Sequence, residues 1–391
     1  MTSRREIYAD HAATTRLAPE VLEAMRPYLD ADFGNASSIH RRGEAAREAI
    51  ETARGQIADL IGAAPEEVVF TATGSEANNL ALQGLMALTT SARRRLVVSA
   101  IEHPSVLETA RHLESRGVPV TVVPVDRDGI VDPDRLEAAL GSDVALVSVM
   151  WVNNETGVIQ PIEAIGERVH RAGARFHVDA VQAVGKLRVR FGDLPCDLLS
   201  LAGHKFEGPL GAAALIVRRR VRLVPLVHGG HQERSRRAGT ENLPAIVGLG
   251  AAAARAEACL DAGPRPAEAM GDRLLEQFES EVSGVRLNGH RSQRLRSIMN
   301  VALEGIDGEA MLHELDLAGI TVSTGSACSA ASTGPSHVLL AMGRTPEEAH
   351  ASVRFSLGDE LEEQDVESIV RETRSAITRL SALNQSTPRS A

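Results

Sequence analysis

The stretch Phe70-Thr71-Ala72-Thr73-Gly74-Ser75-Glu76-Ala77-Asn78-Asn79-Leu80 decides the fold class of this chain. It starts at the end of a β-branched run, Glu67–Thr71, and leads into a helical stretch predicted over residues 76–88. The same alternation continues along the chain, with further helices predicted at 104–116, 133–140 and 161–172. The strands between them are predicted at Leu96–Ser99, Val118–Val123, Val144–Val149 and Phe176–Val178. Strands that are apolar on both faces and separated by helices indicate an α/β fold with a mostly parallel sheet sandwiched by helices.

The pattern also predicts how the rest of the chain is organised. Two more strands, Leu198–Leu201 and Ala212–Val217, have no helix between them, which favours an antiparallel pair. Upstream helices are predicted at 19–30 and 44–61, and an Ala-rich helix at 244–262 ends at Gly263-Pro264-Arg265-Pro266, which we interpret as a domain boundary. Beyond it, helix, strand, helix and strand recur at 267–282, 297–303, 308–318 and 352–357, before an acidic helix near 360–384. We therefore expect a second, smaller α/β domain.

Composition excludes several classes of protein. The chain has 391 residues, 43% hydrophobic and 24% charged, as expected for a globular protein of two domains. Its net charge of -10 argues against direct nucleic-acid binding or attachment to an anionic membrane by bulk charge. No apolar run approaches the roughly 20 residues that cross a bilayer, and residues 1–6 do not resemble a secretory signal. The three cysteines are far apart, which excludes a disulfide framework and a CxxC metal site. We expect a cytoplasmic enzyme.

Lys205 and Asp179 are the first candidate catalytic residues. Lys205 follows a predicted strand and is bracketed by Gly203 and Gly208, and a lysine there suits a Schiff base with a carbonyl cofactor. Asp179 ends an apolar strand, where a pyridinium nitrogen would be a suitable cationic partner. Taken alone, each residue also has a structural explanation, as a surface lysine and as a helix N-cap.

Polar groups follow other predicted strands at the same edge of the sheet. Gly74 and Ser75 open a helix, where free N–H groups favour an anion, although ordinary helix capping explains them equally well. His103 follows a strand and could stack on an aromatic cofactor or serve only a structural role, and Asn154 follows the strand predicted at Val144–Val149. Ligands of open α/β sheets bind outside the carboxyl ends of the strands, so these groups indicate one site.

At this point the chain resembles the cysteine desulfurases, the NifS/IscS-like branch of the fold-type I pyridoxal-phosphate enzymes (aminotransferase class V). Besides the blocks above, the resemblance rests on three others, which extend it nearly end to end: Tyr8-Ala9-Asp10-His11-Ala12-Ala13-Thr14-Thr15, Phe33-Gly34-Asn35-Ala36-Ser37-Ser38 and Val353-Arg354-Phe355-Ser356-Leu357-Gly358. It implies a large cofactor domain of residues 15–262 and a small domain of residues 1–14 and 263–391.

The resemblance implies pyridoxal 5'-phosphate as cofactor and L-cysteine as substrate. Lys205 would bind the cofactor aldehyde and move the substrate proton, and His103 would stack on the ring. Asp179 would pair with the ring nitrogen and Gln182 would reach the phenolic oxygen. The phosphate contacts would come from Gly74, Ser75, His204 and, across a homodimer interface, Thr240. The substrate carboxylate would be held by Asn35, Asn154 and Arg354, with Asn154 also touching the cofactor.

Cys328 would accept the sulfur, giving L-alanine and a persulfide for transfer to an acceptor protein. It lies in a loop, residues 323–334, whose other members are all Gly, Ala, Ser or Thr, which suits a mobile carrier. For Cys196 and Cys259 we expect ordinary structural roles. A metal site is not expected, because five candidate histidines lack compact spacing: His11, His103, His204, His228 and His231.

Three positions depart from the family pattern. Ala202 replaces a serine that many relatives place on the phosphate, and Leu210 and His231 replace a lysine and a glycine. These departures affect the expected phosphate contacts and leave the reaction type unchanged. The alternatives are a selenocysteine lyase or another β-eliminating lyase of this fold, and a catalytically silent sulfur-relay or scaffold protein. The acceptor pathway stays open among iron–sulfur cluster assembly, tRNA thiolation, cofactor synthesis and DNA sulfur modification.

Overall fold

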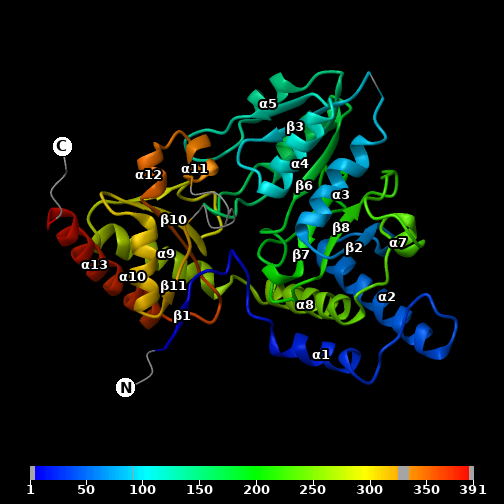
Figure 1. Ribbon diagram of the computed structural model, residues 1–391, viewed down its shortest axis with the longest axis horizontal. Helices are drawn as coiled ribbons and strands as arrows, with labels where there is room; N and C mark the ends of the chain where they lie inside the picture. The colour runs from blue at the N-terminus through cyan, green and yellow to red at the C-terminus, as the bar shows by residue number, and fades with distance from the viewer. Residues whose placement is uncertain (1–4, 91, 325–333, 387–391) are drawn as a thin grey trace.

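The computed structural model describes residues 5–90, 92–324 and 334–386. Its centre is a seven-stranded sheet with the order β2-β8-β7-β6-β5-β3-β4 (Figure 1). The strands are β2 (Val68–Thr71), β3 (Arg95–Ser99), β4 (Val120–Val123), β5 (Val144–Met150), β6 (Arg175–Asp179), β7 (Leu198–Ala202) and β8 (Ala213–Val217). β8 is antiparallel to both of its neighbours, and the other paired strands are parallel. The mostly parallel sheet and the antiparallel β7–β8 pair predicted from the sequence are confirmed.

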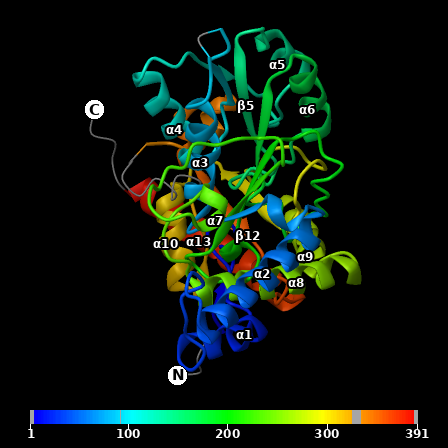
Figure 2. The same cartoon turned by 90° about the vertical axis from the view of Figure 1, so that its right-hand side faces the viewer.

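Successive side chains along a strand point to opposite faces of the sheet. The strands of this sheet carry apolar side chains at consecutive positions, so both faces are buried. Val97 and Phe176 belong to one apolar core, and Leu96 and Val98 belong to a second core on the opposite face. Helices α2 (Arg41–Ile61), α6 (Ile162–Arg171) and α8 (Leu243–Ala262) cover the first core, and α3 (Gly74–Met86) and α4 (Pro104–Ser115) cover the second. Figure 2 shows α3 and α4 on one side of β5 and α6 on the other.

A smaller unit lies beside the large sheet (Figure 1). Its three-stranded sheet has the order β12-β10-β9 and is antiparallel throughout. Its elements are β9 (Val285–Asn288), β10 (Ile298–Leu303), β12 (Ser352–Ser356), α9 (Pro266–Glu281), α10 (Gly308–Leu317) and α13 (Glu363–Ser386). Phe278 and Phe355 pack edge to face in its apolar core, with ring centroids 5.2 Å apart.

The N-terminal segment joins the two units. Strand β1 (Ile7–Tyr8) pairs in parallel with β11 (Ile320–Thr321), and Ile7 belongs to the core of the smaller unit. The chain then crosses to the large unit, where the Thr15 N–H donates to the carbonyl of His204 (2.9 Å). The domain boundaries given above stay a prediction.

The structure adds short elements that the sequence pattern did not predict: β1, β9, β11, α7 (Gln232–Ser235), α11 (His337–Ala341) and α12 (Pro346–His350). The other helices are α1 (Pro19–Leu29) and α5 (Pro133–Ala139), close to their predicted bounds. Helix α2 begins three residues earlier than predicted, because the His40 ring caps it by accepting the Gly43 N–H (3.3 Å).

Helix α8 is the one helix of the described residues that is long and apolar enough to cross a membrane. The expectation that no apolar run approaches the length of a membrane-spanning helix is therefore wrong, because α8 reaches that length and is sufficiently apolar. The helix packs against α1 and α2, and half of its apolar window is buried inside the protein. This burial matches the core helix of a globular domain.

Candidate active site

A cavity of about 330 Å³ opens at the carboxyl ends of β5, β6 and β7. Asp179 is the last residue of β6 and Ala202 is the last residue of β7, so two strand ends form its wall. Eight of the predicted site residues line it: Gly74, Ser75, His103, Asn154, Asp179, Gln182, His204 and Lys205. Parallel strands end at one edge of a sheet, which explains why residues so distant in sequence meet here.

Lys205 lies on a short 3-10 turn, Gly203–Lys205, directly after β7. Its Nζ donates to the carbonyl oxygens of Ala12 (2.6 Å) and Ala13 (2.7 Å), so the N-terminal segment holds the amine at the cavity wall. The chain needs a glycine where it returns toward this turn, because a Cβ at Gly208 would lie 2.9 Å from the carbonyl oxygen of Gly203.

The second lysine of the chain, Lys186, is its only other amine side chain. Lys186 does not line this cavity, and its Nζ donates to Oε1 of Gln182 (2.7 Å). Burial, with the charges of Arg265 and Lys205, lowers the pKa of Lys186 well below its usual value. The Gln182 amide nitrogen in turn donates to the Ala12 carbonyl (2.8 Å).

Asp179 is buried and accepts two hydrogen bonds from neutral donors. Its Oδ1 accepts the N–H of Val181 (3.1 Å) and its Oδ2 accepts the amide of Asn78 (2.7 Å). Neither of these donors carries a positive charge that would neutralise the carboxylate, which suits a protonated ring nitrogen as its partner. The Asn78 Oδ1 atom is also buried and has no hydrogen-bond partner within the described part of the chain.

His103 caps helix α4 and lies next to this carboxylate. Its Nδ1 accepts the N–H of Ser105 (3.1 Å) and lies 2.8 Å from the Ser105 hydroxyl, which accepts from Asn78 (2.9 Å). Burial lowers the pKa of His103, partly opposed by the charge of Asp179, so the ring is neutral near pH 7.

The opposite end of the cavity is built to receive an anion. Thr73 caps α3 by accepting the Glu76 N–H (3.0 Å), which leaves the first N–H groups of the helix at the cavity beside Ser75. His204 lies at the same cavity, with its Nδ1 3.1 Å from the hydroxyl of Thr14. Burial and the charges of Lys205 and Lys186 lower the pKa of His204 to about 4. Ala202 contributes only a methyl group to this wall.

Three predicted site residues do not line the cavity. Arg354 is fully buried behind Asn154, whose carbonyl oxygen accepts from its Nη1 (2.9 Å). Asn35 and Thr240 are exposed, and the Asn35 side chain accepts the N–H of Ser37 (2.9 Å). Cys328 lies outside the described residues, so its predicted role is not addressed by the geometry.

Several residues of the site were missed by the sequence analysis. Asn78 follows Ser75 by three positions on α3, a spacing that shares one helix face and could have indicated it. Glu102 gave no such signal, because a glutamate before a helix is usually exposed. It is buried, accepts the N–H of Met150 (2.8 Å) and so joins the ends of β3 and β5, and burial raises its pKa to about 8.

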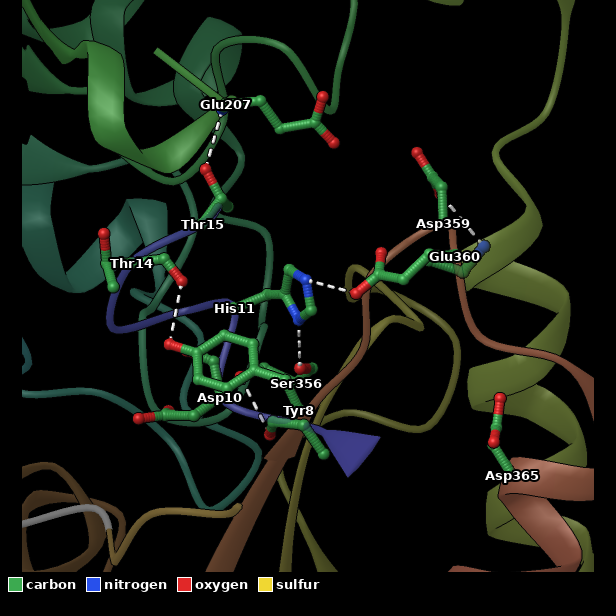
Figure 3. A network of polar contacts seen from close by, with 12 residues as sticks. Tyr8, Asp10, His11, Thr14, Thr15, Glu207, Ser356, Asp359, Glu360 and Asp365 are labelled. Atoms are coloured by element: carbon green, nitrogen blue, oxygen red, sulfur yellow. Dashed lines mark hydrogen bonds and ion pairs between the residues drawn. The ribbon is translucent and has the colours of Figure 1, made fainter. Parts of the chain in front are cut away.

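The N-terminal segment forms a second network behind the cavity (Figure 3). The Tyr8 hydroxyl lies 3.1 Å from the carbonyl oxygen of Thr14, His11 Nε2 lies 2.9 Å from Glu360, and the Thr15 hydroxyl accepts the Glu207 N–H (2.7 Å). The segment therefore fixes the lysine-bearing turn to the smaller unit. A group of three or more potential metal-ligating side chains is absent from the described ranges.

Taken together, the cavity fits pyridoxal 5'-phosphate. A buried carboxylate at Asp179 suits a ring nitrogen, an amine at Lys205 suits an aldehyde, and the start of α3 suits a phosphate.

Comparison with known proteins gives concordant matches. Residues 7–369 match the family model described as Aminotransferase class-V. A curated relative from Dictyoglomus turgidum, "Cysteine desulfurase IscS", is 45% identical over 355 residues, covering 91% of this chain and 90% of the relative. A solved structure of a "NifS-like protein" has a TM-score of 0.91 at 33% identity, covering 96% of this chain and 100% of that chain. Another, "SspA in complex with cysteine", has a TM-score of 0.80 at 38% identity, covering 90% and 98%.

Proposed function

Because the chain belongs to the class-V aminotransferase family and, within it, to the cysteine desulfurases, we propose that it removes sulfur from L-cysteine at the cavity around Lys205, giving L-alanine and a persulfide on Cys328. One observation carries the proposal: of the two lysines in the chain, Lys205 shares the cavity with the buried Asp179.

Pyridoxal 5'-phosphate, when bound, would supply an electron sink that allows the α-proton of the amino acid to leave. Seven residues would hold it: Lys205 at the aldehyde, Asp179 at the ring nitrogen, His103 on the ring face, Gln182 at the phenolic oxygen, and Gly74, Ser75 and His204 at the phosphate. Ala202 has no hydroxyl to offer to the phosphate. The phosphate contacts within this cavity would therefore come from the start of α3 and from His204.

Lys205 would move the substrate proton. The carbonyl oxygens of Ala12 and Ala13 hold its Nζ in the cavity, within reach of a bound amino acid. An amine held within hydrogen-bond reach of the substrate can accept and return a proton, which is general acid–base catalysis. Asp179 supports this step, because its fixed negative charge favours the protonated ring that withdraws electrons.

The sulfur step is assigned to Cys328. Its thiolate forms a bond with the sulfur of the substrate while the bond from that sulfur to Cβ breaks. The bonding electron pair stays with the carbon, which takes up a proton to become the methyl group of alanine. The persulfide then remains on the protein and is available to an acceptor.

We extend the proposal to a cytoplasmic homodimer that serves a sulfur-acceptor protein. Thr240 supports the dimer, because it is exposed and outside the cavity of its own chain, as expected of a residue that serves a neighbouring subunit. Iron–sulfur cluster assembly is one proposed destination of the sulfur, by similarity to relatives with the IscS name.

The proposal is tested by incubating the full-length protein, loaded with pyridoxal phosphate, with L-cysteine. Alanine is quantified, and the Cys328 peptide is analysed by mass spectrometry for one added sulfur atom. We expect Cys328→Ala to abolish desulfuration, whereas Cys259→Ala, a matched change in α8, retains it. Undiminished alanine formation by Cys328→Ala would refute the sulfur assignment. Turnover of selenocysteine alone would indicate a selenocysteine lyase, and no alanine from the loaded wild type would indicate a silent relay protein.

A further inference from the structure

Arg354, the predicted anchor of the substrate carboxylate, already holds a carboxylate of this chain. Its Nη2 lies 2.6 Å from Oδ1 of Asp10, and its Nη1 donates to the Asn154 carbonyl (2.9 Å). The Arg354 side chain is only 1% exposed, so this ion pair is shielded from solvent on the arginine side.

Backbone pairing holds the two partners in register. Strand β12 carries Arg354, and Ser356 of the same strand forms a bridge with Asp10. The N–H of Ser356 donates to the carbonyl of Ala9 (2.8 Å), and the Tyr8 hydroxyl lies 3.1 Å from the carbonyl oxygen of Asp10. Backbone pairing between the N-terminal segment and β12 therefore holds Asp10 opposite Arg354.

The guanidinium still has hydrogen-bonding capacity for a second carboxylate. Its Nε is buried and has no hydrogen-bond partner among the residues that the structure describes. A guanidinium binds a carboxylate most strongly through two parallel N–H groups, and an incoming carboxylate that uses Nε would take Nη2 as its second donor. Nη2 is the atom that Asp10 now occupies.

We propose that Asp10 is a stand-in for the substrate carboxylate: it neutralises and positions Arg354 until substrate binds, and L-cysteine binds by displacing it from Nη2. This inference rests on the proposed function. Two carboxylates beside one buried arginine repel each other, so the negative charge of Asp10 weakens substrate binding. Asp10 in turn prevents an uncompensated buried charge while no substrate is present.

The test is the affinity of the loaded, full-length protein for L-alanine, the product, which carries the same carboxylate and cannot donate sulfur. In Asp10→Asn the competing charge is gone, and we expect the Kd of L-alanine to fall about fivefold or more. L-Alaninamide lacks the carboxylate, and its Kd is expected to stay the same. The KM for L-cysteine should fall with that Kd, without a rise in kcat.

Asp143→Asn is the matched control, because Asp143 also pairs with an arginine, Arg95, at 2.8 Å but lies outside the cavity lining. It should leave the Kd of L-alanine unchanged. Asp10→Ser is the second neutral variant. If either Asp10 variant is destabilised, L-alanine should raise its melting temperature more than that of the wild type.

A Kd for L-alanine that is unchanged or higher in both folded neutral variants would overturn the stand-in role and indicate that Asp10 only positions Arg354. That result leaves the proposed function intact if the wild type still desulfurates L-cysteine. A wild type that neither binds L-alanine nor desulfurates L-cysteine would instead refute the proposed function.

Discussion

The hydroxyl of Thr14 lies 3.1 Å from Nδ1 of His204, although 190 residues separate them in the sequence. The neighbouring Thr15 hydroxyl donates to the carbonyl of His204 (3.0 Å). His204 directly precedes Lys205, so the N-terminal segment fixes the orientation of the residue next to the proposed catalytic lysine. A neutral imidazole with Nδ1 engaged by Thr14 offers its other nitrogen to the anion end of the cavity.

Thr14→Val should therefore weaken retention of the cofactor. Loss of one hydrogen bond of about 1 kcal/mol corresponds to about a fivefold higher Kd for pyridoxal phosphate, because the imidazole is no longer oriented toward the phosphate. The Kd is measured by absorbance titration of the stripped protein. Thr14→Ser keeps the hydroxyl and should restore the wild-type value. Equal affinity in Thr14→Val and the wild type would show that the contact does not position His204.

Asp179→Asn should lower kcat while leaving the protein folded. The amide keeps the shape of the side chain and one of its two accepting oxygens, but it lacks the negative charge that stabilises a protonated ring nitrogen. We expect a fall of about a hundredfold or more, the scale found when one preorganised electrostatic partner is removed. The measurement is kcat for alanine formation at full cofactor occupancy, verified by absorbance. An unchanged kcat at that occupancy would contradict the role of Asp179.

His177 should make the fold sensitive to acid. Its two ring nitrogens lie 2.8 Å from the Ser148 hydroxyl and 2.9 Å from the Ser200 hydroxyl, and burial lowers its pKa to about 3. Between pH 6.5 and about 3 the unfolded chain binds a proton that the folded chain does not, so stability falls as the pH falls through that window.

The change that tests this is His177→Gln, followed by urea unfolding between pH 4 and pH 8. Removing the buried imidazole should reduce the slope of the unfolding free energy against pH by up to about 1.4 kcal/mol per pH unit, the slope for one proton. His112→Gln, on the exposed side of α4, is the control. Parallel stability curves for His177→Gln and the wild type would show that His177 takes up its proton in the folded state as well.

Replacing Glu233 should lower the free energy of unfolding far more than replacing a surface carboxylate. It is buried and accepts from both Nη1 (2.9 Å) and Nη2 (2.8 Å) of Arg54, and also from the N–H of Phe70 (2.9 Å). Glu233→Ala leaves Arg54 buried without its main partner, for which we expect a loss of about 3–5 kcal/mol. Asp143→Ala breaks a solvent-exposed pair with Arg95, which water and salt screen, so we expect a much smaller loss of stability. Similar losses in both variants by chemical denaturation would contradict this ranking.

The alternation of apolar strands and helices in the sequence predicted the large sheet well. Its strands carry apolar side chains on both faces and are separated by helices of ordinary length. The same regularity placed Asp179 and Lys205 at strand ends, and the structure brings them to one cavity. Strand β9 was missed because its sequence, Val285-Arg286-Leu287-Asn288, is short and lies at a sheet edge, where pattern is weak.

Contacts between distant segments could not be predicted in this way. The carbonyl oxygens of Ala12 and Ala13 carry no side-chain signal, yet they hold Lys205. The burial of Arg354 against Asp10 depends on the bridge between the N-terminal segment and β12, which only the folded chain creates.

The central claim, that Lys205 carries the cofactor, is tested most directly by reducing the loaded protein with borohydride and mapping the modified peptide. The chain has only two lysines, so the covalent bond between amine and aldehyde has only two possible side-chain positions. Lys186 is a real competitor, because burial lowers its pKa and favours the reactive neutral amine. The account predicts that the reduced cofactor is found on Lys205 and that Lys186 is unmodified. Modification of Lys186, or a loaded protein in which neither lysine is labelled, would contradict it.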